Sequence, residues 1–236
     1  MKILLVGYGK MGRLVGELAP QYGCEVAGIV DPAASANTAA HTAVLDDPQW
    51  KGVDVAIDFT SPEAVVANVA TLAKLGVNIV LGTTGWRTHE AELRAAVANA
   101  NIGIVAAPNF STGVVLFDAL VARAATLFSA QPEFGAFLHE AHHMAKKDAP
   151  SGTGLMLKSS MVEAGYSRPI DVSVTRAGYI PGTHTIGFDG PSESITLTHT
   201  ARDRGAFARG ALTAATWIAG RRGWFTMQDV LGIANR

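Results

Sequence analysis

The chain has 236 residues, of which 48% are hydrophobic and 17% charged, a composition typical of a folded globular protein rather than a disordered one. Its 19 Lys and Arg against 20 Asp and Glu give a net charge of −1, so the charge does not favour a nucleic-acid or membrane-surface partner. Cys24 is the only cysteine, which excludes an intrachain disulfide and predicts a reducing compartment. No apolar run approaches the length of a membrane span, and we expect a soluble, cytoplasmic protein.

Residues 1–106 alternate short β-rich runs with helical patterns. Strands are predicted at 2–6, 25–30, 53–59, 78–81 and 102–106, and helices after residue 12, over 62–75 and over about 90–99. The second helix has a clear start, with Ser61 as its N-cap and Pro62 at its first position. Residues 33–51 have weak periodicity and are predicted as a loop with at most one helical turn. Strands that alternate with helices form right-handed crossovers, which predicts a Rossmann-like parallel sheet.

After residue 111 the pattern changes. Helices are predicted at about 114–129, 154–162 and 205–219, and strands at 134–140, 171–175, 182–188 and 194–201. The last three strands have no helix between them, which predicts a mixed or antiparallel sheet. We therefore predict an α/β protein with a Rossmann-like dinucleotide-binding domain over 1–108 and a second, α+β domain from 109 onward.

The first predicted turn carries a dinucleotide-binding pattern, Gly7-x-Gly9-x-x-Gly12, between a strand and a helix. Its glycines permit a tight turn, close backbone approach to a pyrophosphate, and close helix–strand packing. The N-terminus of the following helix favours phosphate groups. Asp31 ends the second strand at the position of an acid that accepts hydrogen bonds from the ribose 2′-hydroxyl of NAD(H). This combination predicts a nicotinamide dinucleotide site.

The residues around Asp31 also predict a cofactor preference. A carboxylate repels the 2′-phosphate of NADP(H), and Pro32 rather than an arginine follows it. Lys10 and Arg13 lie near enough in sequence to offset part of that repulsion. We expect NADH to be preferred and NADPH to be tolerated.

Two later turns also follow predicted parallel strands, one at Gly82, Thr83 and Thr84 and the other at 107–110. Ligands of open α/β sheets lie at the carboxyl ends of the strands. These turns are candidates for contacts with the nicotinamide end of the cofactor, although ordinary turn chemistry explains them about equally well.

The stretch 139–154 concentrates groups that transfer protons and bind anions in one predicted loop. His142 and His143 can exchange protons near neutral pH. Lys146 and Lys147 suit an anionic substrate. Further on, the turn at 151–153 precedes a helix, where a hydroxyl and free N–H groups can bind a carboxylate or phosphate. The alternative is a solvated, capped loop, but such a cluster is more often a site.

Taken together, motifs from one end of the chain to the other resemble the dihydrodipicolinate reductase (4-hydroxy-tetrahydrodipicolinate reductase) family. They are Gly-Tyr-Gly-Lys-Met-Gly at 7–12, Asp58-Phe59-Thr60 with Pro62, Gly82-Thr83-Thr84-Gly85, Pro108-Asn109-Phe110-Ser111, the long Glu140 to Thr153 segment, Arg176-Ala-Gly178 with Gly182 and His184, Arg204 with Phe207 and Gly210, and Met227 with Asp229. The segment from 140 to 153 is the most specific of them.

The resemblance implies a fold, an assembly and a reaction. The family combines a Rossmann-like domain with a mixed-sheet domain that builds a homotetramer, and its C-terminus returns to the first domain. The second domain, for substrate binding and oligomerisation, would then cover 109–213, and residues from about 214 to 236 would rejoin the first. The implied reaction is the NAD(P)H-dependent reduction of a small cyclic dicarboxylate to tetrahydrodipicolinate, in lysine and diaminopimelate biosynthesis.

The resemblance also implies residue roles. His142 would be the catalytic proton donor and Lys146 a second one, and no metal site is implied. The implied substrate-binding residues are His143, Ser151, Gly152 and Thr153. The implied cofactor-binding residues are Gly7, Tyr8, Gly9, Lys10, Met11, Gly12, Asp31, Phe59, Gly82, Thr83, Thr84, Ala107, Pro108, Asn109 and Phe110.

Two alternative functions stay open from the residues themselves. One is a different two-domain Rossmann dehydrogenase that acts on a hydroxy acid or a sugar, for which the paired histidines, lysine and Ser-Gly-Thr turn would be unusual. The other is a non-catalytic NAD(H)-binding sensor, which would bind NADH without turning over any carbonyl or imine substrate.

Overall fold

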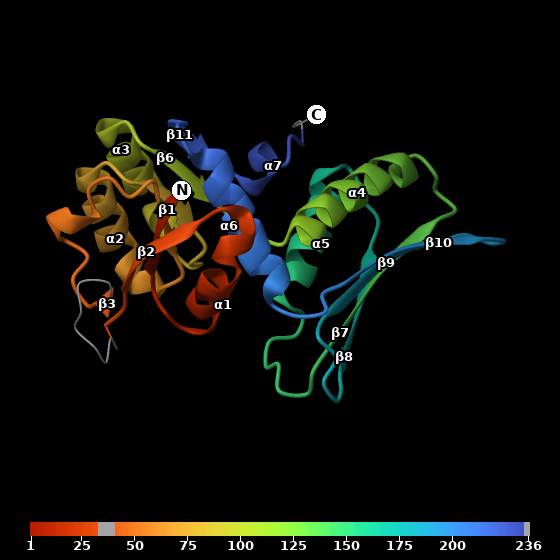
Figure 1. The fold of residues 1–236 in the computed structure, drawn as a ribbon. Helices are drawn as coiled ribbons and strands as arrows, with labels where there is room; N and C mark the ends of the chain where they lie inside the picture. The colour runs from red at the N-terminus through yellow and green to blue at the C-terminus, as the bar shows by residue number, and fades with distance from the viewer. Residues whose placement is uncertain (33–40, 234–236) are drawn as a thin grey trace. The chain divides into compact units, whose positions relative to one another are not determined.

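A computed structural model describes residues 1–32 and 41–233. The chain divides into two compact units, Met1–Thr112 with Gly205–Arg236, and Gly113–Arg204 (Figure 1). The predicted second boundary, at 213/214, lies inside helix α6 (Gly205–Ile218). All of α6 belongs to the first unit, because it packs against β4, β5 and β6 of the first sheet.

The first unit contains a seven-stranded sheet in the order β11-β6-β5-β4-β1-β2-β3. Its strands are β1 (Lys2–Val6), β2 (Glu25–Val30), β3 (His41–Thr42), β4 (Val55–Asp58), β5 (Asn78–Leu81), β6 (Gly103–Ala106) and β11 (Gly223–Phe225). Every pairing is parallel, which confirms the predicted Rossmann-like sheet. β1 pairs with both β2 and β4, so the strand order reverses on its two sides and opens a crevice at the carboxyl ends.

Helices cover both faces of this sheet. They are α1 (Lys10–Leu18), α2 (Pro62–Leu75), α3 (Glu90–Ala100), α6 and α7 (Met227–Val230), with short 3-10 turns at Ala19–Tyr22, Pro48–Trp50 and Arg87–His89. α1 packs beside α6, and α2 packs beside α3 (Figure 1). All the residues of β4, β5 and β6 are buried, as expected for parallel strands with helices on both sides.

The C-terminal segment adds an edge to the first sheet. β11 pairs with β6, with Gly223 opposite Gly103, and α7 follows with a capping box formed by Thr226 and Asp229. β11 and the two-residue β3 were not among the predicted strands. They are too short to produce an alternating pattern, and only pairing with a neighbour defines them.

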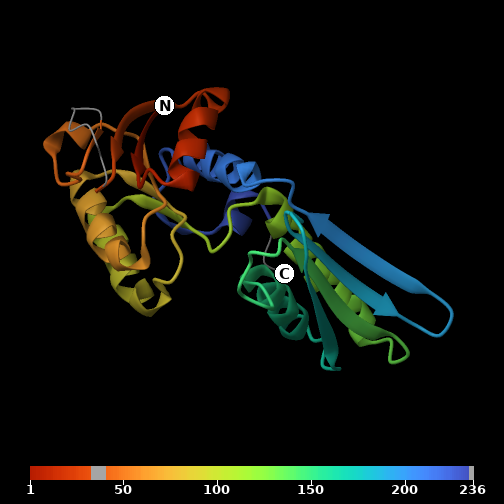
Figure 2. The ribbon, with the colours of Figure 1, turned by 90° about the horizontal axis from the view of Figure 1, so that it is seen from below.

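The second unit contains a four-stranded mixed sheet in the order β10-β9-β7-β8. Its strands are β7 (Gly135–His142), β8 (Ile170–Arg176), β9 (Thr183–Asp189) and β10 (Ser194–Thr200). β7 pairs in parallel with β8 and antiparallel with β9, which pairs antiparallel with β10 (Figure 2). The predicted mixed sheet is confirmed.

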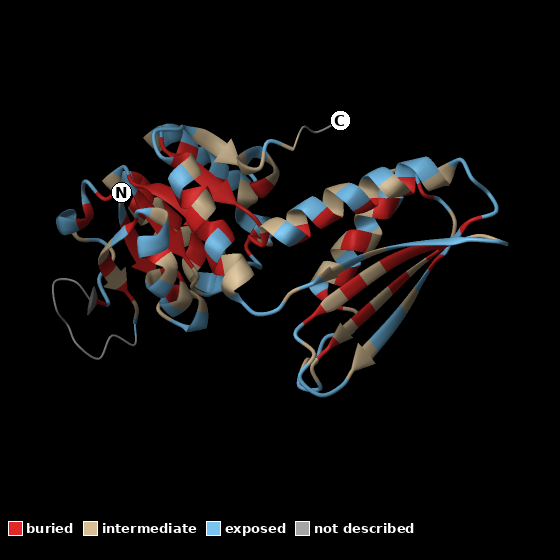
Figure 3. Cartoon of the chain, turned by 45° about the vertical axis from the view of Figure 1, so that its right-hand side comes forward, coloured by how far each residue is buried: buried red, intermediate tan, exposed pale blue. Residues whose placement is uncertain are grey.

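Helices α4 (Thr112–Ser129) and α5 (Gly152–Glu163) contribute to one core with this sheet. That core includes Phe117 and Val121 of α4, Leu157 of α5, Leu138 of β7 and Phe188 of β9. Buried and partly exposed residues alternate along β7 (Figure 3). The helices therefore cover the face that carries Leu138 and, two residues further, Glu140.

Helix α4 corrects one expectation. Its 18 residues have a mean hydropathy of 1.5, and length and composition alone would allow it to cross a membrane. By the criterion of length and composition, the expectation that no apolar run approaches the length of a membrane span is therefore wrong. The criterion is weak, because a core helix of a soluble protein also meets it, and the buried side chains Phe117, Val121 and Ala125 of α4 belong to the second core.

Candidate functional site

The glycine turn after β1 has the geometry that a dinucleotide requires. Gly7 has φ +87°, and a Cβ there would lie 2.4 Å from the Phe59 carbonyl oxygen. A Cβ on Gly12 would lie 2.0 Å from the Gly7 oxygen, so only glycine lets α1 start this close to the turn. Gly9 has nothing within 4 Å of its Cβ position. The backbone at Gly9, the N-cap of α1, is therefore open to a phosphate group.

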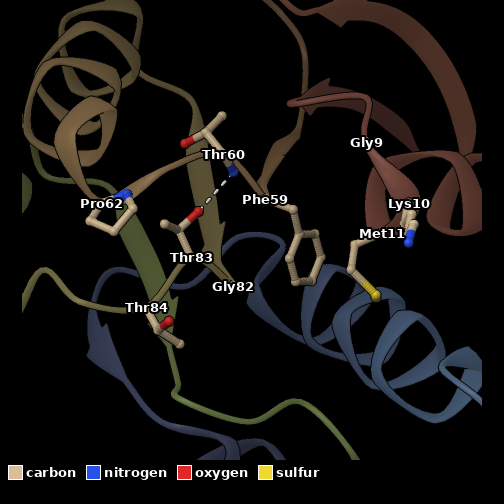
Figure 4. Close-up of a pocket in the computed structure, with 9 residues that line it drawn as sticks. All are labelled: Gly9, Lys10, Met11, Phe59, Thr60, Pro62, Gly82, Thr83 and Thr84. Carbon is tan, nitrogen blue, oxygen red and sulfur yellow. Dashed lines mark hydrogen bonds between the residues drawn. The ribbon is translucent and has the colours of Figure 1, made fainter. Parts of the chain in front are cut away.

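A pocket of about 410 Å³ lies at the carboxyl ends of the strands of the first unit, within the usual range for small-molecule sites. Its lining residues are Gly9, Lys10, Met11, Phe59, Thr60, Pro62, Gly82, Thr83 and Thr84 (Figure 4). Seven of them were predicted as cofactor contacts, and only Thr60 and Pro62 were not. The pocket lies at the crevice between β1 and β4, where the strand order reverses.

A buried carboxylate holds two of the pocket turns together. Asp58 has no exposed surface, and its Oδ1 accepts hydrogen bonds from Thr60 N, Thr60 Oγ1 and Thr83 Oγ1 at 3.0, 2.7 and 2.9 Å. Its Oδ2 accepts one from Asn68 Nδ2 at 2.9 Å. Thr60 N also donates to Thr83 Oγ1 at 2.8 Å (Figure 4). This network fixes the loops after β4 and β5 relative to each other.

Asp31 lies beside the glycine turn, as its predicted role requires. Its Oδ2 accepts a hydrogen bond from Tyr8 N at 2.5 Å. Arg13 donates from Nε to the Tyr8 carbonyl at 3.2 Å, and its guanidinium lies 5.4 Å from the Tyr8 ring centre. The acid and this arginine therefore both contact Tyr8, next to the first turn of α1.

The predicted contacts at Ala107, Pro108, Asn109 and Phe110 follow β6 but do not line the pocket. Phe110 is buried, and its ring packs edge-on against Phe59 with centres 6.4 Å apart. A Cβ on Gly210 would lie 1.6 Å from the Phe110 oxygen. Phe110 thus supports Phe59, while contact of this turn with the cofactor stays a prediction.

In the second unit, His142 is the last residue of β7 and not part of a loop, which corrects the predicted strand end at 140. The pairing of β7 with β8 continues to His142 opposite Arg176, and a strand partner far along the chain extends the strand beyond its local apolar pattern. Glu140 and His142 consequently point to the same, helix-covered face.

Glu140 is the centre of a buried network. It has no exposed surface, and its Oε1 accepts from Ser151 N at 2.9 Å and from Arg176 Nη2 at 2.5 Å. Its Oε2 accepts from Ser151 Oγ at 2.5 Å. Nδ1 of His142 lies 3.8 Å from Oε1, and Nε2 of His184 lies 3.6 Å from Oε2. Two histidines, one arginine and the start of α5 therefore surround one carboxylate.

These contacts shift the pKa values of the network. Burial alone would raise the pKa of Glu140, but hydrogen bonds from Ser151 and Arg176 outweigh it and lower that pKa. Burial lowers the pKa of His142, Glu140 opposes this, and Lys146 and Arg176 add to the lowering. Burial and the nearby His142 lower the pKa of His184 to about 4. At neutral pH the carboxylate is therefore charged and His184 is neutral.

Lys146 is partly exposed and forms an ion pair within its own loop. Its Nζ donates to both carboxylate oxygens of Asp148 at 2.8 and 2.9 Å, while Lys147 is exposed. Two further contacts hold this loop, since Met144 N donates to Gly178 O at 3.1 Å and Arg176 donates to Asp148 O at 2.6 Å. His143 is partly exposed at the start of the loop.

The predicted anion turn begins at Ser151, the N-cap of α5. Its hydroxyl accepts from Gly154 N at 3.1 Å and donates to Glu140. Its backbone N–H also donates to Glu140, so Glu140 takes both donors of Ser151. Gly152 and Thr153 occupy the first two helical positions, whose N–H groups have no partner inside a helix. The geometry therefore favours Gly152 and Thr153 as anion-binding residues over Ser151.

Glu140, His142 and His184 have ligand atoms within 4.8 Å of one another, close enough to hold a metal ion. However, the Arg176 guanidinium and the donors of Ser151 contact both oxygens of Glu140. A metal cation would have to displace these groups and would be repelled by Arg176. The arrangement fits a charge network better than a metal centre.

The sequence did not single out Glu140, Arg176 and His184 as site residues. Glu140 lies on β7, Arg176 on β8 and His184 on β9, and Glu140 is 36 residues from Arg176 in the chain. Only the pairing of these strands brings the three side chains together. Their one signal was their presence in the motifs that supported the family resemblance.

Two family models cover almost the whole chain. The model described as "Dihydrodipicolinate reductase, N-terminus" matches residues 1–110, and the one described as "Dihydrodipicolinate reductase, C-terminus" matches residues 113–231. The chain belongs to the dihydrodipicolinate reductase family. The glycine turn and pocket lie within the N-terminal match, and the network around Glu140 lies within the C-terminal match.

Relatives and a solved structure agree with this membership in the dihydrodipicolinate reductase family. Proteins named 4-hydroxy-tetrahydrodipicolinate reductase are 32% identical in Christiangramia forsetii, over 98% of both chains, and 37% identical in Caulobacter vibrioides, over 98% of this chain and 97% of the other. The fold matches that of a dipicolinate-bound dihydrodipicolinate reductase from Paenisporosarcina sp. TG-14 with a TM-score of 0.86, at 20% identity over 99% of both chains.

Proposed function

We propose that the chain is a 4-hydroxy-tetrahydrodipicolinate reductase, which uses a nicotinamide dinucleotide to reduce a cyclic dicarboxylate to tetrahydrodipicolinate. The observation that carries this proposal is the match of both family models along the chain. The reductase names of the relatives support an oxidoreductase of the lysine pathway. The solved dipicolinate complex of a similar fold supports a dicarboxylate ligand.

The cofactor binds in the first unit. Gly9 leaves space for phosphates at the N-terminus of α1, and the pocket between Met11, Phe59 and Thr83 is large enough for a small-molecule ring system. When bound, the nicotinamide supplies the hydride. We propose that Asp31 makes NADH the preferred form, and that Arg13, which also contacts Tyr8, lets NADPH bind.

The second unit supplies proton transfer and substrate binding. His142 donates the proton that accompanies the hydride, and its lowered pKa makes it a stronger acid than an ordinary histidine. Lys146 is a second donor and stabilises negative charge that develops on the substrate. Gly152 and Thr153 bind a substrate carboxylate through the N-terminus of α5, and His143 contacts the substrate at the start of the loop.

The assembly and the compartment are parts of the same proposal. The outer face of the second sheet carries a ladder of hydroxyls, with hydrogen bonds between Thr183 and Thr200 and between Thr185 and Thr198, each 3.0 Å long. This regular face supports a homotetramer built through the second sheet, which sedimentation velocity would test. A cytoplasmic enzyme without a nucleic-acid or membrane partner fits the near-neutral charge.

One assay tests the function. NADH oxidation is followed optically while freshly made product of dihydrodipicolinate synthase is added. We expect NADH consumption that requires both the chain and that product. NADH binding without consumption would favour a non-catalytic sensor, and turnover only with a hydroxy acid or sugar would favour a different dehydrogenase.

A further inference from the structure

We propose that Glu140 is a positioning residue for the reduction, because one carboxylate lies beside the proton donor His142 and anchors the substrate-binding start of α5. This inference rests on the proposed function and assigns a role to a residue that would not itself touch the substrate. It also assigns Ser151 to the same network rather than to the substrate.

The first support is the way Glu140 holds the start of α5. Its Oε2 accepts from Ser151 Oγ at 2.5 Å, and its Oε1 and Oε2 accept from Ser151 N at 2.9 and 3.0 Å. Gly154 has no side chain where a Cβ would lie 2.4 Å from Oε2, so the helix can approach the carboxylate. The positions of the Gly152 and Thr153 N–H groups therefore depend on where Glu140 lies.

The second support is the relation between Glu140 and His142. Both are buried on the same face of β7, with His142 Nδ1 3.8 Å from Glu140 Oε1. Among the described residues, this Nδ1 has no hydrogen-bond partner. A buried negative charge at this distance favours the imidazolium form, which is the form that donates a proton. The Glu140 charge thus helps keep His142 ready as an acid.

The third support is Arg176, which closes the network on the substrate loop. Its Nη2 donates to Glu140 Oε1 at 2.5 Å and to Asp148 O at 2.6 Å. Asp148 in turn pairs with Lys146. One chain of contacts therefore connects Glu140 to the second proposed proton donor as well as to the first.

The test is Glu140→Gln, with Glu193→Gln as the matched control at an exposed position of the same unit. Glutamine removes the charge and replaces one acceptor oxygen with an amide donor, which faces the Ser151 N–H at either position and also Arg176 at the Oε1 position. We expect kcat to fall at least ~10-fold, part of the ~10²-fold or more that a general acid contributes. The KM for the dicarboxylate should rise, and the KM for NADH should stay unchanged.

The pH profile separates positioning from a merely structural role. The charged and titratable groups that face His142 are Glu140 on β7, Arg176 on β8, His184 on β9, and Lys146 and Asp148 in the loop. Without the Glu140 charge, the remaining cations Lys146 and Arg176 disfavour the imidazolium. The fall of kcat at high pH should therefore move to lower pH in Glu140→Gln and stay in place in Glu193→Gln.

The kinetics and the melting temperature of Glu140→Gln decide the proposal. Wild-type kcat with an unshifted pH profile in a folded Glu140→Gln variant would overturn it, as would a lower melting temperature with unchanged kinetics. If that variant does not fold, Glu140→Asp decides, since it keeps the charge but shortens the reach by one methylene. We expect an intermediate loss of kcat, and wild-type kcat would count against the proposal.

Dipicolinate binding distinguishes this inference from the proposed function. Titration calorimetry with dipicolinate in the presence of NADH should show weaker binding to Glu140→Gln than to Glu193→Gln. If the wild type binds dipicolinate but never oxidises NADH, the proposed function fails while the positioning of α5 is still measured. Equal dipicolinate affinity of the two variants would overturn the role of Glu140 in placing Gly152 and Thr153.

Discussion

At the scale of single residues, the proposed mechanism depends most directly on two proton donors, His142 and Lys146. His142→Gln and Lys146→Ala should each lower kcat by at least ~10², the size of a general-acid contribution. NADH affinity should be retained, because the pocket lies in the other unit. Steady-state kinetics and NADH fluorescence titration measure both quantities. Lys147→Ala is the matched control, since Lys147 is the exposed neighbour, and a wild-type rate in either variant would remove that residue from the chemistry.

The proposed cofactor preference also rests on a single residue, Asp31. Asp31→Ala removes the carboxylate that repels a 2′-phosphate and leaves Arg13 beside Tyr8. The ratio of kcat/KM for NADPH to that for NADH should rise at least ~10-fold, equivalent to about 1.4 kcal/mol. The control is Asp46→Ala, an exposed acid of the same unit. If the two variants give the same ratio, Asp31 does not face the ribose.

At the scale of elements, Asp58 holds together the turns after β4 and β5, which line the pocket. In Asp58→Asn the new amide nitrogen replaces one of the two acceptor oxygens. It then faces either the donor Asn68 Nδ2 or the donors of Thr60 and Thr83. A buried donor left without an acceptor costs about 1–3 kcal/mol. The turns after β4 and β5 should loosen, so the KM for NADH should rise more than the KM for the dicarboxylate.

The kinetic comparison for Asp58 needs a control close to it in the chain. Asp54→Asn changes an exposed acid just before β4, which accepts from Lys2 N at 2.7 Å. We expect its NADH kinetics to match the wild type. Equal KM values for NADH in all three proteins would mean that Asp58 stabilises the fold without shaping the pocket.

At the scale of the whole molecule, the buried histidines make stability depend on pH. The pKa of His184 is about 4 in the folded chain, against an ordinary value of 6.5, so between these values the unfolded chain binds more protons. Stability should therefore decrease as pH falls from 6.5 to about 4, by up to about 1.4 kcal/mol per pH unit for one proton. The lowered pKa of His142 acts in the same direction.

Chemical denaturation from pH 7 to pH 4 measures this dependence. His184→Gln should have a smaller slope of unfolding free energy against pH than the wild type, whatever its absolute stability. His89→Gln is the control, because His89 is largely exposed in the first unit. Identical slopes for wild type and His184→Gln would mean that His184 titrates normally in the folded chain.

Local pattern was enough to predict most of the fold. β1, β2 and β5 lie where their apolar runs predicted them, and α2 begins after Ser61 at Pro62 as its start signal indicated. These features depend on residues next to each other in the chain. The pocket residues Phe59, Gly82 and Thr83 could be predicted for a related reason, since parallel strands of one sheet end at the same edge.

The sequence by itself determined the glycine turn, the two kinds of sheet and the clustering of histidines and lysines near residue 142, because glycine spacing, periodicity and residue chemistry are local properties. Only the tertiary structure decided that His142 ends a strand, that α6 belongs to the first unit, and that Glu140 meets Ser151, Arg176 and His184. Those features depend on strand pairing and burial between segments distant in the chain. The free energy of a buried carboxylate is set by neighbours that no local pattern reveals.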